Sequence, residues 1–263
     1  MITGGSSGIG EALAVEAAGR GAHLTLLARG AERLERVAAQ VGAGASASAV
    51  AGLACDVSDR DAVRSVFATA VADRGPVDVL ICSAGITLPG RFLEADDDVF
   101  RSMMDVDYFG TLWPIREVAP SMVERRSGSI VGVSSACALA GIYGYSAYGA
   151  AKFAVRGLLE SLRTELVPHG VHVCCVYPPD VDTPMLAEED RFKPAETKAI
   201  SGSIKPISAA QVATAIIDGI DDGQAEIYAD LQTRAFARTV TAVPGVYRRL
   251  FDRRVRKVSS PDH

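Results

Sequence analysis

The sequence predicts an α/β fold built on one doubly wound, parallel sheet. Five apolar segments alternate with segments of helical period along residues 11–179. The apolar segments show little polar alternation, as expected of parallel strands that helices cover on both faces. Such an alternation of strands and helices favours right-handed crossovers and a single parallel sheet.

The elements follow one another at regular intervals. The predicted strands are residues 23–28, 48–57, 77–85, 128–136 and 171–179. The predicted helices are residues 11–21, 31–43, 58–75 and 148–170. Ser58 is the expected N-cap of the third helix, because acidic Asp59 and Asp61 follow it. Pro168 and Gly170 are expected to end the fourth helix.

The chain shows no internal repeat, no low-complexity linker and no second domain. We expect one Rossmann-type domain over residues 1–233 and a basic C-terminal extension over residues 234–263. Polar, proline-containing residues near 184–206 lack a regular period. They follow the fifth predicted strand, and ligands of open α/β sheets bind beyond the carboxyl ends of strands. We therefore expect this segment to be a mobile lid.

Composition restricts the class of function. The chain has 263 residues, 48% of them hydrophobic, and a net charge of −5. An acidic chain of this kind gives no indication of nucleic-acid binding. The five cysteines are scattered and the four histidines lie far apart, so we expect reduced thiols and no metal site. We expect a cytoplasmic protein, since no signal peptide and no membrane-spanning run are visible.

The chain opens with a glycine-rich turn, MITGGSSGIG. Small residues at Gly4, Gly8 and Gly10 allow the backbone to approach a pyrophosphate at a helix N-terminus. The spacing GxxxGxG differs from the usual GxGxxG, so its weight comes from the strand and helix that follow. The candidate cofactor-binding residues of this turn are Thr3, Gly4, Ser6, Ser7, Gly8, Ile9 and Gly10.

Only Met1, Ile2 and Thr3 precede the turn, whereas strands usually run for about 5–6 residues. These residues make only the carboxyl end of a strand that belongs at the centre of the sheet. The first strand is therefore expected to be truncated. We favour a natural chain that starts upstream of Met1 over a sheet that tolerates a short central strand.

Arg29 indicates the choice of nicotinamide cofactor. In NAD-binding folds an acidic residue near the end of the second strand bonds the ribose 2′-hydroxyl. Here Ala28 and Arg29 occupy that place. An arginine pairs with a 2′-phosphate through charge-assisted hydrogen bonds. The sequence therefore predicts NADP(H), against the simpler alternative of a solvated surface arginine.

Three side chains have the types needed for carbonyl chemistry. Tyr148 and Lys152 are four residues apart on a predicted helix and share a face. An ammonium near a phenol favours the phenolate and lowers its pKa. Ser135 ends a predicted strand, where its hydroxyl can hold a carbonyl oxygen. Each residue alone also has an ordinary structural explanation, as a helical pair or a capping serine.

Together these motifs resemble the short-chain dehydrogenases/reductases, over nearly the whole chain from TGGSSGIG through YGAAK to YPPDVDTPM. The resemblance implies that Tyr148 is the general acid in ketone reduction, with Lys152 binding the nicotinamide ribose and Ser135 orienting the carbonyl. It also implies a second group of cofactor contacts. These are Asp56 and Val57 on the adenine side, Ser83, Ala84 and Gly85 after the next strand, and Pro178, Val181 and Thr183 at the nicotinamide carboxamide.

Two positions depart from the family pattern. Ser83 stands where the resemblance implies an asparagine, and we expect it to hydrogen-bond less fully. Asp107 stands at the asparagine of the family's catalytic tetrad. In the family the backbone carbonyl there holds a relay water, which an aspartate also supplies, but an ionised carboxylate loses the amide's donor. We expect an active enzyme with a shifted pH profile.

The stretches GIYGYSAYGAAKFAVRGLLESL and VYPPDVDTPMLAEEDRFKPAETKAIS are most similar to the 3-ketodihydrosphingosine reductases of this family. This resemblance implies NADPH-dependent reduction of a long-chain ketone in sphingolipid synthesis. Apolar Met185 and Leu186 suit a lipid substrate. Glu188, Glu189 and Asp190 are either a site for a cationic amine or, the alternative we favour, part of a solvated lid.

Two other functions stay open at this point. One is a reductase or dehydrogenase of another acyl-chain or small ketone or alcohol. The other is a noncatalytic scaffold that binds the cofactor and whose chemistry is impaired by Asp107. The retained set of Ser135, Tyr148 and Lys152 argues against a scaffold.

The C-terminal segment PGVYRRLFDRRVRKV has a net charge of five positive units, with apolar residues interleaved. Such a basic amphipathic helix can lie on an anionic membrane surface. An equally weighted alternative is a helix that packs on the lid or on a partner subunit. The family resemblance also implies a homodimer or homotetramer, formed through the helices that carry Asp107 and Tyr148.

Overall fold

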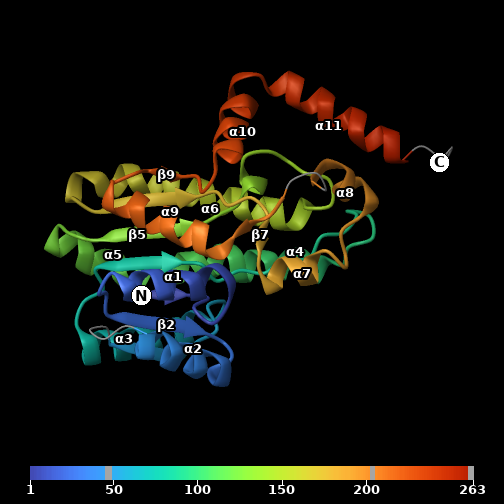
Figure 1. Ribbon diagram of the computed structural model, residues 1–263. Coiled ribbons are helices and arrows are strands. Elements are labelled where there is room, and N and C mark those ends of the chain that lie inside the picture. Colours follow the sequence, from blue (N-terminus) through green and yellow to red (C-terminus); the bar gives the residue numbers. More distant parts are fainter. Residues whose placement is uncertain (45–48, 202–204, 260–263) are drawn as a thin grey trace.

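A parallel sheet of seven strands, in the order β3-β2-β1-β4-β5-β6-β9, runs through the middle of the molecule (Figure 1). This computed structural model describes residues 1–44, 49–201 and 205–259. The strands are β1 (Ile2–Thr3), β2 (Leu24–Ala28), β3 (Val50–Ala54), β4 (Val79–Cys82), β5 (Ser129–Val133), β6 (His172–Val176) and β9 (Glu226–Ile227). The predicted doubly wound fold is confirmed.

Helices cover both faces of the sheet. One face carries α1 (Gly8–Gly19), α2 (Ala31–Gly44) and α9 (Ala209–Asp221), and the other carries α3 (Arg60–Arg74), α5 (Gly110–Arg125) and α6 (Ser146–Leu166). Neighbouring strand residues belong to opposite cores: Leu26 packs with the first face, and Leu27 with the second. Burial on both sides explains why the strands are apolar throughout.

The strand order reverses beside the short first strand. β1 pairs with β2 through Ile2 and Leu26, and with β4 through Ile2 and Ile81. The chain thus builds outward from β1 to β3, and then outward on the other side from β4. The crevice beyond the carboxyl ends of strands at such a reversal is where open α/β sheets bind ligands. The glycine turn after β1 lies at this crevice.

The observed helix boundaries differ from the predicted ones, most informatively at the starts of α3 and α6. The N-cap of α3 is Asp59, whose carboxylate accepts hydrogen bonds from the backbone N–H groups of Asp61 and Ala62 at 2.9 and 3.0 Å. The predicted cap, Ser58, instead donates to Asp56. An aspartate in the capping position satisfies two free N–H groups, so the helix starts there. α6 begins at Ser146, two residues before Tyr148.

The helical region between β4 and β5 was not predicted from the sequence period, and only the family resemblance implied a helix that carries Asp107. It comprises α4 (Asp97–Met103), the π-helix η1 (Met104–Phe109) and α5. Pro114 and Pro120 lie inside α5 and interrupt its sequence signal, because proline usually ends a helix. The π-helix carries Asp107 and directly precedes α5.

The predicted lid is held at both of its ends. β7 (Val181–Asp182) pairs in parallel with β8 (Ile207–Ser208), so the chain leaves and re-enters the body side by side. Between them lie α7 (Pro184–Glu189) and α8 (Ala195–Ser201). Residues 202–204 of the predicted lid, 260–263 of the predicted tail and residue 48 of the second predicted strand lie outside the described residues.

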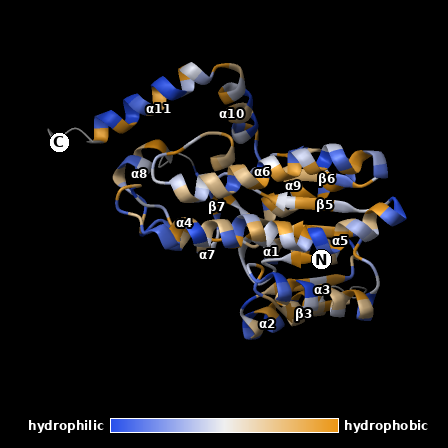
Figure 2. Ribbon diagram, turned by 180° about the vertical axis from the view of Figure 1, so that it is seen from behind, coloured by the Kyte–Doolittle hydropathy of each residue, from blue (hydrophilic) through white to orange (hydrophobic). Residues whose placement is uncertain are grey.

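The C-terminal region forms two helices that stand out from the layered body (Figure 1). They are α10 (Leu231–Ala242) and α11 (Pro244–Ser259). The expected domain boundary at residues 233/234 falls inside α10. Figure 2 shows hydrophilic and hydrophobic residues alternating along α11. Among the described residues, no helix is both long and apolar enough to cross a membrane.

Candidate active site

The glycine turn is built for close backbone approach. Gly4 has a φ of 69°, and a Cβ atom on it would lie 2.8 Å from the Cα of Ala84. A Cβ on Gly10 would lie 2.2 Å from the carbonyl oxygen of Gly4. Gly8, with a φ of 55°, opens α1 beside Thr183. Any larger side chain at Gly4 or Gly10 would displace backbone, so these positions require glycine. The result is a narrow cradle at a helix N-terminus.

Thr3 links the turn to the end of β4. Its hydroxyl oxygen accepts hydrogen bonds from the backbone N–H groups of Ser83 and Ala84, at 3.1 and 3.2 Å. The replacement of asparagine by serine at position 83 thus leaves the backbone of this turn anchored. Gly85 faces Asp107, and a Cβ on Gly85 would lie 2.7 Å from the Asp107 carboxylate.

Arg29 and Asp56 follow the neighbouring strands β2 and β3. Arg29 is exposed. Asp56 accepts hydrogen bonds from the backbone N–H and the hydroxyl of Ser58, at 3.0 and 2.7 Å. Burial raises the pKa of Asp56, but the Ser58 bonds and the charge of Arg29 outweigh it and lower the pKa overall. The side chain of Val57 packs on Gly110. Asp56 is thus the residue at this strand end whose side chain can accept a hydrogen bond.

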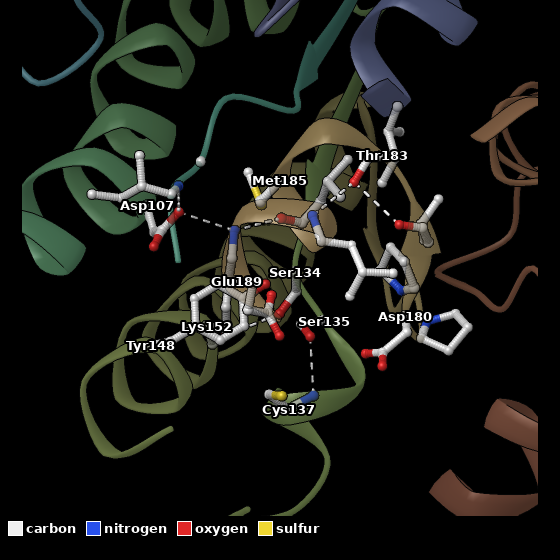
Figure 3. Close-up of a pocket in the computed structure, with 18 of the residues that line it drawn as sticks. Asp107, Ser134, Ser135, Cys137, Tyr148, Lys152, Asp180, Thr183, Met185 and Glu189 are labelled. Atoms are coloured by element: carbon white, nitrogen blue, oxygen red, sulfur yellow. Dashed lines mark hydrogen bonds and ion pairs between the residues drawn. The ribbon is translucent and has the colours of Figure 1, made fainter. Parts of the chain in front are cut away.

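Asp107, Tyr148 and Lys152 meet below the crevice (Figure 3). The ammonium of Lys152 lies 3.3 Å from the Asp107 carboxylate and donates to the carbonyl of Val133 at 3.2 Å. It also lies 5.6 Å from the centre of the Tyr148 ring. The side chains of Lys152 and Asp107 are 6% and 0% exposed, so the pair is shielded from water.

Asp107 uses its two carboxylate oxygens unequally. One oxygen accepts from the backbone N–H of Ile86 at 3.1 Å and faces Lys152. The other is buried, with no hydrogen-bond partner among the described residues. Burial raises the pKa of Asp107, and Lys152 and the Ile86 bond oppose the rise only in part. The backbone carbonyl of Asp107 accepts from the hydroxyl of Thr111 at 2.8 Å.

Two serines at the end of β5 form different hydrogen bonds. Ser134 donates to the backbone carbonyl of Lys152 at 2.9 Å and thereby ties the strand to α6. Ser135 accepts from the backbone N–H of Cys137 at 3.1 Å and caps the short helix η2 (Ala136–Ala138). Ser135 is thus a capping serine that also lines the pocket. The sequence analysis did not identify Ser134.

The overall pKa of Tyr148 is not lowered as expected, although Lys152 lies beside its ring. Burial raises the pKa of Tyr148 well above its ordinary value, and Cys137 and Asp107 add to the rise. A hydrogen bond with Ser135 opposes it. Desolvation of the phenolate by burial is the largest cause of the rise. In this state the phenol keeps its proton, as a general acid must.

These groups open into one cavity of about 130 Å³. It gathers predicted residues from the ends of β1, β4, β5 and β6: Ile9, Ser83, Gly85, Asp107, Ser135, Tyr148, Lys152, Pro178, Val181 and Thr183. Arg29, Asp56 and Val57 do not line it, because they follow β2 and β3 further along the same sheet edge. Thr183 caps α7, accepting from Leu186 at 3.3 Å, and so connects the site to the lid.

The lid places a carboxylate in this cavity. Glu189 is 9% exposed and accepts a hydrogen bond from the hydroxyl of Tyr145. Lys193 lies 3.0 Å from Glu189, 2.8 Å from Asp190 and 3.5 Å from Asp180. The prediction of a solvated acidic segment is therefore wrong for Glu189. The spacing of Glu189, Asp190 and Lys193 was an available signal, since groups three and four residues apart meet on a helical turn.

The basic tail covers the lid. The hydroxyl of Tyr247 donates to the carbonyl of Gly141 at 2.5 Å, and Arg254 donates to the carbonyl of Ile200 at 3.4 Å. Tyr247 and Phe251 pack with their ring centres 4.5 Å apart, and both lie against Phe236 of α10. Packing on the lid, one of the alternatives from the sequence, is what α11 does in this structure.

Comparison with known proteins places these features in context. The family model described as short chain dehydrogenase matches residues 1–194. A 3-ketodihydrosphingosine reductase of Dictyostelium discoideum is 37% identical, over 96% of this chain and 80% of that protein. A 3-dehydrosphinganine reductase of Danio rerio is 42% identical, over 82% of this chain and 66% of that protein. The chain thus spans about two thirds of the second relative's length.

Solved structures agree with the fold. A short-chain dehydrogenase from Sphingobium yanoikuyae, in complex with NADPH, superposes with a TM-score of 0.79 at 26% identity. That match covers 95% of this chain and 94% of the other. Levodione reductase superposes with a TM-score of 0.81 at 26% identity, covering 89% and 96%.

Proposed function

Because the chain belongs to the short-chain dehydrogenase family, we propose that it reduces 3-ketodihydrosphingosine to dihydrosphingosine in sphingolipid synthesis, with NADPH as the reductant. The relatives from Dictyostelium discoideum and Danio rerio carry the names of this reductase activity. The single structural observation that carries the proposal is the convergence of Ser135, Tyr148 and Lys152 on one cavity beside the glycine turn.

The residues of the crevice fit a dinucleotide. The cradle of Gly4, Gly8 and Gly10 has no room for side chains, and the N-terminus of α1 supplies free N–H groups for phosphate oxygens. Ser6, Ser7 and Ile9 complete this phosphate-binding turn. Asp56 and Val57 would hold the adenine side of the cofactor, and Ser83, Ala84 and Gly85 would contact it beyond the end of β4. Pro178, Val181 and Thr183 hold the carboxamide.

Arg29 selects the phosphorylated cofactor. It is exposed at the end of β2 and its charge acts on Asp56, so it stands at the adenosine end of the crevice. Its guanidinium pairs with the 2′-phosphate. Replacing Arg29 with alanine should weaken NADPH binding by roughly tenfold or more, because charge-assisted hydrogen bonds are lost. NADH binding should stay unchanged, and equal losses for both cofactors in calorimetry would refute this role.

The cofactor supplies the hydride, and the side chains of the cavity handle the carbonyl and the proton. Ser135 donates a hydrogen bond to the carbonyl oxygen and stabilises the charge that develops there. Tyr148 donates its phenolic proton to the same oxygen, which completes the alcohol. The ammonium of Lys152 then favours the phenolate that remains. Lys152 also binds the nicotinamide ribose.

Asp107 orients this lysine. With Val133 it fixes the ammonium from two sides, at 3.3 and 3.2 Å. Among the described residues its second oxygen has no hydrogen-bond partner, so this buried oxygen can take up a proton. This direct ion pair is how the chain works without the usual asparagine.

A product assay tests the proposed function. Purified protein is incubated with NADPH and a panel of long-chain ketones that includes 3-ketodihydrosphingosine, and the products are identified by mass spectrometry. We expect dihydrosphingosine, and faster NADPH oxidation with this ketone than with ketones that lack the amine. Faster turnover of an unrelated small ketone would replace the proposal by a different reductase activity.

The tail also contacts membranes in the proposed function, as a peripheral attachment of a cytoplasmic enzyme. Val246 and Leu250 are 52% and 55% exposed on α11, beside its arginines. Apolar groups flanked by basic ones suit an anionic lipid surface. In flotation with anionic liposomes the intact protein should rise with the lipid, and a chain ended after Val243 should not. If both remain in the soluble fraction, membrane contact is refuted.

We further propose a homodimer or homotetramer formed through α5 and α6. Both helices leave apolar residues in a shallow surface groove that includes Leu112, Val123 and Leu162. A second copy covering this surface would bury it. Light scattering should give a mass that is two or four times that of the chain, whereas a monomer mass would contradict the assembly.

A further inference from the structure

A large groove runs between α11 and the chain that leads into α6. Its volume is about 890 Å³. One wall consists of the turn after η2 and the first turns of α6. The other is the side of α11 that carries apolar residues together with the charged Arg248, Asp252 and Arg256. Ile200 of the lid helix α8 adds to the lining. The groove therefore lies where the body, the lid and the tail meet.

The groove continues the catalytic cavity. Ile142 and Tyr145 line both spaces. The catalytic cavity, at about 130 Å³, is smaller than the roughly 300–1,000 Å³ of sites that enclose a drug-sized ligand, and the groove falls within that range. A substrate that reacts at Tyr148 and is longer than the cavity can extend past Ile142 and Tyr145 into the groove.

The chemistry of the walls suits an unbranched apolar chain. Small residues on the α6 side leave open space: a Cβ on Gly141 would meet no atom within 4 Å, and Ala150 is exposed. Phe153, on the same helix, leaves 41% of its surface exposed. On the opposite wall the Tyr247 hydroxyl is bonded to the carbonyl of Gly141, so this phenol presents its ring to the groove.

We propose that this groove binds the alkyl chain of the ketone substrate while the keto group lies at Ser135 and Tyr148. The inference rests on the proposed function, which requires an amphiphile with one long chain. Two observations support this occupant. The groove shares lining with the catalytic cavity, and apolar side chains of both walls line it, with the charged Arg248, Asp252 and Arg256 beside them on α11. α11 thus forms one wall of a chain-binding site.

The division of α11 keeps chain binding separate from membrane contact. The groove is lined by Tyr247, Phe251 and Val255, whereas Val246 and Leu250 are among the exposed apolar residues of α11. A bulky residue in the groove should therefore change chain-length preference without changing flotation with liposomes.

The test compares ligands that differ only in chain length. Ala150→Trp fills the groove from the α6 wall, and Val255→Trp fills it from α11. Ala68→Trp, at an exposed alanine of α3 away from the groove, is the matched control. Calorimetry with NADPH present measures the binding of two sphinganines, one with a chain of octadecyl length and one with a chain of octyl length. The kcat/KM of the corresponding 3-ketones is measured in parallel.

In the wild type the octadecyl ligand should bind at least about tenfold more tightly than the octyl ligand, because burying each additional methylene is favourable. Both groove variants should reduce this preference by about tenfold, and Ala68→Trp should retain it. Equal binding of both ligands by the wild type, or a retained preference in both groove variants, would overturn the inference. So would a change of oligomeric mass in both variants without a change of preference, since a second copy would then occupy the groove.

The two proposals fail in different ways. If the wild type prefers the octadecyl ligand but reduces neither 3-ketone, the groove is a chain-binding site and the proposed reaction is wrong. If it reduces both 3-ketones with equal kcat/KM and binds both ligands equally, the reaction stands and the groove does not hold the chain.

Discussion

Two buried lysines lie beside the catalytic cavity, and their surroundings differ. Lys152 on α6 has one carboxylate at 3.3 Å and a backbone carbonyl at 3.2 Å. Lys193 on the lid has three carboxylates, at 2.8, 3.0 and 3.5 Å. Burial lowers the pKa of Lys193, but these carboxylates outweigh it and raise the pKa overall. The charge of Lys193 is thus balanced by carboxylates that hold the lid in place. The charge of Lys152, which has one carboxylate beside it, can act on Tyr148.

The two ammonium groups beside the same cavity therefore have different effects on their neighbours. A buried ammonium that is surrounded by carboxylates fixes the position of its segment and has little influence on other groups. A buried ammonium with a single carboxylate retains a field that acts on the next polar group, here the phenol ring 5.6 Å away. Lys152 should therefore control the reaction and Lys193 the lid.

The largest effect is expected at Lys152. Lys152→Met removes the charge that stabilises the Tyr148 phenolate and should lower kcat/KM by about 10²- to 10⁴-fold, the range of general acid–base contributions. Steady-state kinetics with NADPH measures this, and circular dichroism confirms folding. If Lys193→Met lowered kcat as much as Lys152→Met, the distinction between the two lysines would be wrong.

The next effect is expected at the lid. Lys193→Met leaves the buried Glu189 without its cation, and breaking such a pair costs about 3–5 kcal/mol. Hydrogen exchange should show faster opening of α7 and α8, together with a raised KM and a kcat that changes much less. Lys198→Met makes the same substitution at an exposed lysine of the lid and should leave exchange unchanged. Equal exchange in both variants would contradict a structural role for Lys193.

A smaller effect, one of pH dependence, is expected from Asp107. Its folded pKa is raised by burial, so the folded protein binds a proton more tightly there than the unfolded chain does. Asp107 therefore costs stability as pH rises above the ordinary aspartate pKa of about 3.9, and the cost is complete above its raised folded pKa.

Asp107→Asn removes this cost and keeps an oxygen for Lys152. The Tm difference between the variant and the wild type should shift in favour of the variant between pH 4 and pH 8, as measured by calorimetry at the two ends of the window that begins near the ordinary pKa. Activity should be retained with an altered pH profile. A Tm difference that is the same at both pH values would show that Asp107 does not titrate in this window.

The sequence predicted the part of the site that depends on local spacing. Tyr148 and Lys152 are four residues apart, the glycines are within one turn, and Ser135 ends a recognisable strand, so a helical or strand period places each of them. The five long strands of the sheet followed from their apolar runs. β9 has only two residues and β1 only two, too few for a period.

The remaining features depend on contacts between distant segments. Nothing local shows that Lys152 meets Asp107, or that Tyr145 meets Glu189, because 45 and 44 residues separate them and the fold brings them together. The raised pKa of Tyr148 arises from burial among Cys137 and Asp107, which pattern reading does not reveal. α5, which follows Asp107, was hidden by two prolines.

Single-turnover reduction of 3-ketodihydrosphingosine by Tyr148→Phe tests the central claim most directly. The phenylalanine keeps the ring beside Lys152 and removes only the proton donor. We predict that the hydride-transfer step, followed by NADPH absorbance, slows by at least about 10²-fold while NADPH binding is retained. An unchanged single-turnover rate in Tyr148→Phe would contradict the assignment of Tyr148 as the general acid, and with it the account of the site.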